Sequence, residues 1–228
     1  MKKTAFTLAE TLIVMGVIGV VAALTLPNLN SSTNNKEKVA KLQKVYSNLQ
    51  DAFGRAEAVY GPYDEWFVND GNDNNKRTKR TFERITEFMK YSKVCTVSDN
   101  CKLKFNAGAS EGDTRNYSII LADGSTLGFD EGGKYIYIDI DGINKGANKP
   151  GRDVFQVGIR PDNNNGQYIL TYGFRDSIKE NSYCCQNNSG EYTAWILVNG
   201  NMDYLKTSDG KTCPDGQKLQ FGVKTSCK

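Results

Sequence analysis

The chain has 228 residues, which is enough for one globular domain and an additional N-terminal helix. Its 29 basic and 26 acidic residues nearly balance, so the net charge of +3 gives no electrostatic argument for a nucleic-acid partner. The sequence contains no histidine, which excludes Ser-His-Asp and Cys-His catalysis and any His-ligated metal site. Composition leaves paired carboxylates for glycoside hydrolysis open, but nothing in the sequence places two of them in one cleft. With no nucleophile–base pattern either, we expect no enzymatic activity.

An apolar stretch over residues 6–27 dominates the N-terminal region, and Glu10 is its one charged side chain. A helix rises about 1.5 Å per residue, so a stretch of this length spans roughly 30 Å, the thickness of the hydrocarbon core of a bilayer. Lys2 and Lys3 precede the stretch and favour a cytoplasmic N-terminus, but lysines also follow it from Lys36 onward, so charge alone leaves the orientation open. The cysteines of the later chain favour an exported head. The pattern predicts a transmembrane helix.

Glu10 is unusual in this setting. A carboxylate inside an apolar helix costs roughly a few kcal/mol, so such a residue usually has a partner or a function. An ordinary secretory signal peptide is the simpler alternative, but its apolar region is normally shorter and lacks an acidic residue. Cleavage just before Phe6 would create an α-amino cation at the end of the same helix. That cation could neutralise Glu10 on a neighbouring copy of the chain.

The run Ala5-Phe6-Thr7-Leu8-Ala9-Glu10 is followed by an apolar helix that contains Gly19 and closes at Pro27. This N-terminus resembles that of type IV pilins and type II secretion pseudopilins. The resemblance implies that a prepilin peptidase cuts the bond between Ala5 and Phe6 and methylates the new amine of Phe6. It also implies that Glu10 is the assembly carboxylate. Ala5 departs from the family pattern, which usually has Gly there, and the resemblance covers about the first 30 residues only.

The resemblance implies a structural subunit of a type II secretion pseudopilus or a type IV pilus. The expected partners are other copies of the chain, other pilins or pseudopilins, the prepilin peptidase and an inner-membrane assembly platform. The expected location is a single pass through the inner membrane with the head in the periplasm, followed by a periplasmic pseudopilus or a surface pilus. The alternative is a minor, tip-located pilin that acts as an adhesin or as a DNA- or ligand-binding module. A membrane-tethered enzyme is a third reading, which the missing histidines disfavour.

The expected fold class is α+β, with a long N-terminal helix whose first half spans the membrane and which packs on an antiparallel, pilin-like head. Four segments follow from this reading: a leader over 1–5, the transmembrane and assembly helix over 6–27, an amphipathic continuation over 28–60, and the head over 61–228.

In the continuation, residues 28–35 are polar and predict a loosened section. From Lys36 onward apolar residues recur at three- and four-residue steps, which predicts a helix that packs on the domain's own sheet: Val39, Leu42, Val45, Tyr46, Leu49, Phe53, Ala56 and Val59.

Turn residues and alternating patterns divide the remaining chain. We expect a loop over 61–80 and a short helix over 81–91. A three-stranded antiparallel meander and a further pair of strands follow, with predicted strands at 117–121, 125–129, 134–140, 154–160 and 167–172. Residues 191–198 favour a helix over a strand.

The six cysteines all lie beyond the apolar stretch: Cys95, Cys101, Cys184, Cys185, Cys213 and Cys227. An even number fits an oxidising compartment and structural disulfides, whereas the absence of a C-x-x-C pair disfavours zinc. Local spacing favours a Cys95–Cys101 bond. Because a bond between neighbours is strained, we expect Cys184 and Cys185 each to reach Cys213 or Cys227, which would tie the C-terminus to the head.

Three further patterns have a structural and a functional reading. The loop that contains Asp139, Asp141, Asn144 and Asp153 gathers oxygen ligands suited to calcium, but Asp-Gly pairs are equally typical of turns, with Arg152 and Asp153 paired at the surface. The basic run at 76–80 is expected in a loop, either as a solvated surface or as part of a DNA-binding patch. The 12 tyrosines, with Trp66 and Trp195, could form an adhesive surface or fill the core.

Overall fold

The computed structural model describes residues 8–96, 104–105, 113–114, 117–142, 145–161, 167–172, 182–185 and 189–227. Within the first of these ranges, the side chains of residues 22–32 are not described. The chain divides into two compact units, Met1–Glu37 and Lys38–Lys228. We call the second unit the head.

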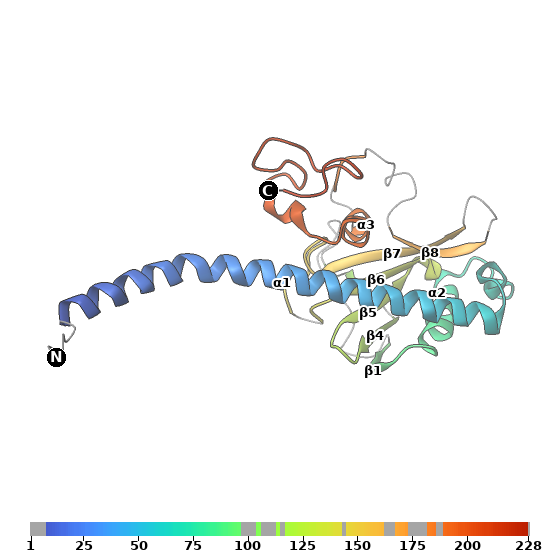
Figure 1. The fold of residues 1–228 in the computed structure, drawn as a ribbon. Coiled ribbons are helices and arrows are strands. Elements are labelled where there is room, and N and C mark those ends of the chain that lie inside the picture. The colour runs from blue at the N-terminus through green and yellow to red at the C-terminus, as the bar shows by residue number, and fades with distance from the viewer. Residues whose placement is uncertain are drawn as a thin grey trace. The chain divides into compact units, whose positions relative to one another are not determined.

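Helix α1 (Leu8–Tyr60) is the first element of the chain (Figure 1). The backbone of residues 28–35 is helical, so the prediction of a loosened section there is wrong. In the head, the predicted apolar stripe of α1 is confirmed except at its last position, where Val59 is exposed. The buried members of the stripe are Val39, Leu42, Val45, Tyr46, Leu49, Phe53 and Ala56. The hydroxyl of Tyr46 also donates a hydrogen bond to the carbonyl oxygen of Leu170, 3.1 Å away, which ties this helix to the sheet.

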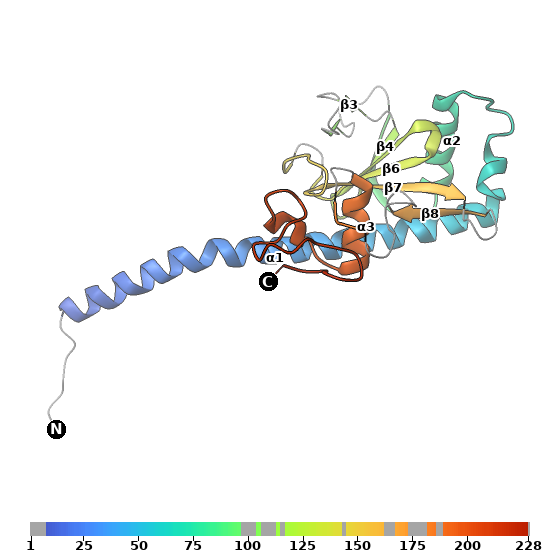
Figure 2. The same cartoon turned by 90° about the horizontal axis from the view of Figure 1, so that it is seen from above.

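The centre of the head is an antiparallel sheet with the strand order β1-β4-β5-β6-β7-β8 (Figures 1 and 2). Its strands are β1 (Tyr91–Cys95), β4 (Tyr117–Leu121), β5 (Thr126–Asp130), β6 (Tyr135–Asp139), β7 (Val154–Pro161) and β8 (Tyr168–Tyr172). A separate pair joins β2 (Lys104–Phe105) to β3 (Asp113–Thr114). The predicted meander and the following strand pair are confirmed within one or two residues at each end.

One face of the sheet is continuously apolar because the strand register places apolar residues opposite one another. Ile119 pairs with Leu127, Leu127 with Ile138, and Ile138 with Phe155. All four side chains are fully buried, and they belong to the same core cluster as the stripe of α1. Burial of each such side chain stabilises the fold by about 1.5–3 kcal/mol. The sheet and the second half of α1 therefore share one core.

Short helices complete the head. They are η1 (Tyr63–Phe67), α2 (Asn74–Thr86), η2 (Glu131–Gly133), α3 (Ser189–Asn199) and η3 (Asp203–Lys206). The helix predicted over 81–91 begins seven residues earlier, because Asp73 caps α2 by accepting hydrogen bonds from the backbone N–H groups of Asn75 and Lys76. The loop prediction for 61–80 is therefore wrong at η1 and at the start of α2. The predicted helix over 191–198 is confirmed as α3.

The predicted fold class needs a correction. No helix among the described residues is both long and apolar enough to cross a membrane. This finding contradicts the predicted membrane-spanning first half, the transmembrane helix and the single-pass inner-membrane location. The observed fold is a six-stranded antiparallel sheet with helices.

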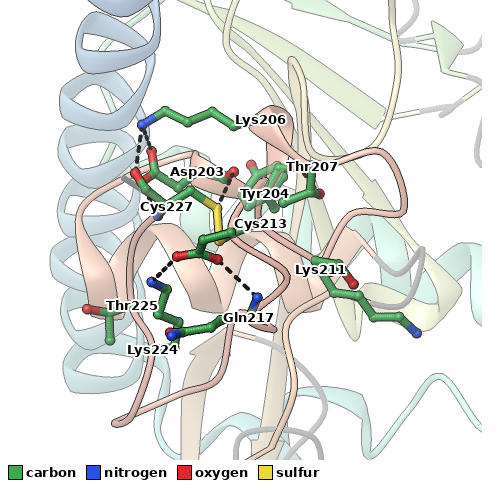
Figure 3. The surroundings of a disulfide bond; sticks show 12 residues. Asp203, Tyr204, Lys206, Thr207, Lys211, Cys213, Gln217, Lys224, Thr225 and Cys227 are labelled. Carbon is green, nitrogen blue, oxygen red and sulfur yellow. Dashed lines mark hydrogen bonds and ion pairs between the residues drawn. A yellow bond between two sulfur atoms is a disulfide. The ribbon is translucent and has the colours of Figure 1, made fainter.

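The C-terminal segment is closed by a disulfide between Cys213 and Cys227, whose Cα atoms lie 5.4 Å apart (Figure 3). Asp203 supports this closure, since its carboxylate accepts a hydrogen bond from the backbone N–H of Cys227 at 2.8 Å and pairs with the Nζ of Lys206 at 2.8 Å. Nearby, the Nζ of Lys224 lies 2.8 Å from an Oδ atom of Asp215. The disulfide fastens the last residues of the chain to the segment around η3.

We predict that replacement of both Cys213 and Cys227 by Ser lowers the free energy of unfolding by about 3 kcal/mol, because the unfolded chain regains the entropy of a loop of about 15 residues. Denaturant unfolding followed by circular dichroism measures this change. Lys224→Ala is the control, since it breaks an ion pair in the same segment and should cost less than about 1 kcal/mol. An unfolding midpoint of the double variant equal to that of Lys224→Ala would contradict the prediction.

Candidate assembly helix and head surface

The described N-terminal part of α1, Leu8–Val21, is exposed and apolar around its circumference. We call it the assembly segment. Its nine large apolar side chains are between 54% and 81% exposed: Leu8, Leu12, Ile13, Val14, Met15, Val17, Ile18, Val20 and Val21. Soluble monomeric proteins rarely expose a continuous apolar surface of this extent, and such a surface marks a site of interaction.

Glu10 lies near the start of the assembly segment, and its residue is exposed. It is the acidic residue in the first turn of α1, where the helix dipole favours a negative charge. The predicted cleavage and methylation positions, Ala5 and Phe6, lie outside the described residues. The predicted pairing of Glu10 with a Phe6 amine therefore stays a prediction.

The loop from Asp139 to Asp153 is organised by its carboxylates. One carboxylate oxygen of Asp139 accepts backbone hydrogen bonds from Asp141 at 3.1 Å and Gly142 at 3.0 Å. The carboxylate of Asp153 accepts three backbone hydrogen bonds, from residues 147, 148 and 149, at 2.5–2.8 Å. Both aspartates are fully or almost fully buried. Because they replace the water that would solvate these N–H groups, the two side chains hold the shape of the loop.

Lys38 supplies a positive charge to this loop. Its Nζ lies 3.0 Å from the Oδ2 of Asp141 and donates a hydrogen bond to the carbonyl oxygen of Arg152 at 3.1 Å. The Asp153 carboxylate accepts backbone hydrogen bonds in place of the predicted surface pair with Arg152. An ion pair of this loop joins Asp141 to Lys38, at the start of the head. Spacing along the chain gave no signal for Lys38, because it lies more than 100 residues from Asp141.

The calcium reading gains no support from the described residues, which contain no group of three or more Asp, Glu, Cys or His side chains suited to a metal ion. Asn144, one of the four predicted ligands, lies outside the described residues. The other three, Asp139, Asp141 and Asp153, lie in one loop, and their described contacts are those of a hydrogen-bonded turn. Two buried oxygens of the loop, the Oδ2 of Asp139 and the Oδ1 of Asn148, have no hydrogen-bond partner among the described residues.

The environment of Asp139 changes its acidity. Burial raises the pKa of Asp139 to about 6, and the negative charges of Asp153 and Asp141 add to the effect. The hydrogen bonds from the backbone of Gly142 and Asp141 act in the opposite direction but are outweighed. The side chain therefore changes its charge between pH 5 and 7, which an exposed aspartate does not do.

The cysteines near the C-terminus pair differently from the prediction. Cys184 and Cys185 are bonded to each other, and Cys213 is bonded to Cys227. The prediction that each neighbour reaches Cys213 or Cys227 is wrong, because those two residues lie within bonding distance of one another in the C-terminal segment. Cys95 is disulfide-bonded, whereas Cys101 lies outside the described residues, so their predicted pairing is not tested.

The basic run at 76–80 lies in α2 and makes contacts along the head, so its predicted place in a loop is wrong. Arg80 forms a two-pronged ion pair with Asp70, at 2.5 and 2.7 Å. Arg77 stacks on the ring of Phe67, with its Cζ atom 4.5 Å from the ring centre. The arginines of the run are thus partly occupied within the protein, which disfavours a DNA-binding patch.

The two tryptophans fill the core. Trp66 is 2% exposed and Trp195 is fully buried. The indole N–H of Trp66 donates a hydrogen bond to the carbonyl oxygen of Gly61, and that of Trp195 donates one to the side chain of Asn201. The core reading of these residues is therefore confirmed, and neither contributes to an adhesive surface.

Comparison with known protein families gives one assignment. Residues 28–222 match a family described as a family of unknown function (DUF6613). The chain belongs to this family. The comparison with curated proteins and the comparison with solved structures each found no match.

The family match begins directly after Pro27, so it covers the continuation of α1 and nearly all of the head. Residues before position 28 lie outside it, and no family of pilins or of prepilin motifs is found. Any function of the assembly segment must therefore be argued from its own residues.

We predict that the contribution of Asp139 to the free energy of unfolding of the head falls as the pH rises from about 4 to about 6. In this window the folded state retains a proton that the unfolded state releases, so the free energy of unfolding decreases by up to about 1.4 kcal/mol per pH unit. Asp139→Asn should remove this contribution. Urea unfolding at pH 4, 5, 6 and 7 gives the difference between the variant and the native chain.

The control is Asp51→Asn, which neutralises an exposed aspartate on α1 that pairs with Arg55. This variant should keep the pH profile of the native chain. Parallel profiles for the native chain and Asp139→Asn would contradict the assigned role of Asp139.

Proposed function

We propose that this protein is the structural subunit of a filament, of the type IV pilus or type II secretion pseudopilus kind, whose copies pack through the assembly segment. The observation that carries the proposal is the exposed apolar surface of Leu8–Val21. Burial of one such large apolar side chain contributes about 1.5–3 kcal/mol, so nine of them represent more than about 10 kcal/mol. That is comparable with the whole stability of a typical domain.

Other copies of the same segment suit this surface best. From Val39 onward, the apolar residues of α1 belong to the same core cluster as the strands of the sheet. The sheet therefore already covers the apolar side of this part of the helix. The assembly segment has apolar side chains on all sides, and a bundle of parallel copies would cover each helix with several neighbours. A filament core is such a bundle.

The proposed order of events begins with processing. Cleavage between Ala5 and Phe6 releases the short basic leader and creates a new amine at Phe6, which the prepilin peptidase methylates. The carboxylate of Glu10 on one copy then pairs with the amine of an incoming copy. Because a charge inside an apolar bundle is costly when unpaired, this contact would also set the axial register between copies. In this role the protein does no catalysis.

A second candidate is a minor, tip-located subunit whose head binds a ligand. The observation that favours it is a cationic pocket in the head, lined by Arg77, Lys134 and Arg160. The two candidates differ in abundance, since a major subunit must be present in large molar excess over a tip protein.

We predict that Glu10→Gln is cleaved normally but fails to assemble. The substitution leaves an incoming amine without its anionic partner inside an apolar bundle, which costs roughly 3–5 kcal/mol per contact and should reduce filament yield by more than about tenfold. Electron microscopy and quantitative blotting of the filament fraction measure the yield. Mass spectrometry of a peptide that begins at methylated Phe6 shows whether cleavage occurred.

Glu37→Gln is the matched control, because it makes the same chemical change at an exposed position outside the assembly segment. It should assemble as the native chain does. A normal filament yield from Glu10→Gln would exclude the pairing mechanism, and absence of the Phe6 peptide from the native chain would exclude processing.

A further inference from the structure

A pocket of about 370 Å³ opens on the head where η1, α2 and the ends of β6, β7 and β8 meet. Three cationic side chains line it, those of Arg77, Lys134 and Arg160. Asp64 is the one carboxylate among the lining residues. The pocket is large enough for a molecule with one ring, and the excess of positive charge selects for an anion.

The two arginines of the pocket are held in place by aromatic rings. The Cζ of Arg77 lies 4.5 Å from the centre of the Phe67 ring. The Cζ of Arg160 lies 5.4 Å from the centre of the Tyr135 ring, and its Nη2 donates a hydrogen bond to the Tyr135 hydroxyl at 2.5 Å. A guanidinium that stacks on a ring through its face, as that of Arg77 does, keeps its N–H edge for hydrogen bonds in its own plane. That edge matches a carboxylate or a phosphate. Arg160 adds positive charge to the pocket, while its own N–H edge already contacts the Tyr135 hydroxyl.

Arg77 has one unsatisfied polar atom in the described part of the head. Its Nε atom is buried and has no hydrogen-bond partner among the described residues. Lys134 is exposed at the start of β6 and adds a second positive charge at the opening. Such an arrangement costs free energy in the empty head, and an anion in the pocket would offset that cost.

Aromatic side chains form the apolar part of the pocket. Tyr63 packs against Phe67 with ring centres 5.0 Å apart and against Tyr168 with ring centres 5.2 Å apart. Burial raises the pKa of Tyr63 to about 12, so its phenol stays neutral near pH 7 and does not cancel the positive charges. Rings arranged in this way suit the flat or apolar face of a sugar or a base.

We propose that this pocket binds a small organic anion, a carboxylate or phosphate carried by a single sugar or base ring. The anionic group lies against Arg77 and Lys134, with the charge of Arg160 nearby, and the ring lies against the half-buried Tyr168, which packs on the buried Tyr63. All of these residues belong to the head, so the proposal holds whether or not the chain forms filaments.

Isothermal titration calorimetry of the full-length chain tests the proposal with three probes: glucuronate, uridine monophosphate and glucose. Binding of either acid, with no binding of glucose, supports it. The acid that binds more tightly identifies an acidic sugar or a nucleotide as the source of the ligand. Absence of binding by both acids overturns the proposal, and so does binding of glucose as tight as that of glucuronate.

Two variants locate the site. Lys134→Glu should weaken binding of the acid by roughly tenfold or more, because it places a negative charge at the opening of the pocket. Lys79→Glu makes the same change at an exposed position of α2 that does not line the pocket, and its affinity should stay within about twofold of the native value. Equal loss in both variants would show non-specific attraction of anions and would overturn the assignment.

Discussion

The apolar surface of Leu8–Val21 is the constraint on which this account depends. Nine large apolar side chains exposed to water represent a free-energy cost comparable with the whole stability of a typical domain. None of these nine side chains belongs to the core cluster of the head, which is formed by the sheet and the later residues of α1. The exposed apolar surface of the assembly segment favours contact with another apolar surface, and in the proposed filament Glu10 pairs with the amine of a neighbouring copy.

Contacts between distant parts of the chain hold the head together around the later residues of α1. The stripe of α1 from Val39 onward shares one core with the strands, and Lys38 joins the first residue of the head to the loop after β6. At the other end of the chain, the Cys213–Cys227 disulfide and the contacts of Asp203 close the C-terminal segment. The proposed anion pocket, lined by Arg77 and Arg160 among others, lies in the same head.

Local patterns predicted much of the head. The three- and four-residue steps after Lys36 gave the buried face of α1, and the turn residues gave the meander, because both signals act over a few neighbouring positions. The failures involve contacts between distant residues. Spacing could not show that Cys213 faces Cys227, that Lys38 meets Asp141, or that Arg77 and Arg160 line one pocket. The predicted membrane-spanning fold class and location are contradicted within the described residues, and the positions Ala5, Phe6 and Asn144, for which processing or metal binding was predicted, lie outside them.

Cross-linking in cells tests whether copies of the chain pack through the assembly segment. Val17→Cys places a thiol on the exposed surface of the segment, and Lys79→Cys places one on the head as a control. We predict covalent dimers on mild oxidation of cells that express Val17→Cys, because neighbouring copies bring their segments together, and few or none with Lys79→Cys. Val17→Cys chains that stay monomeric, although a maleimide reagent labels their thiol, would contradict packing of the protein through this helix.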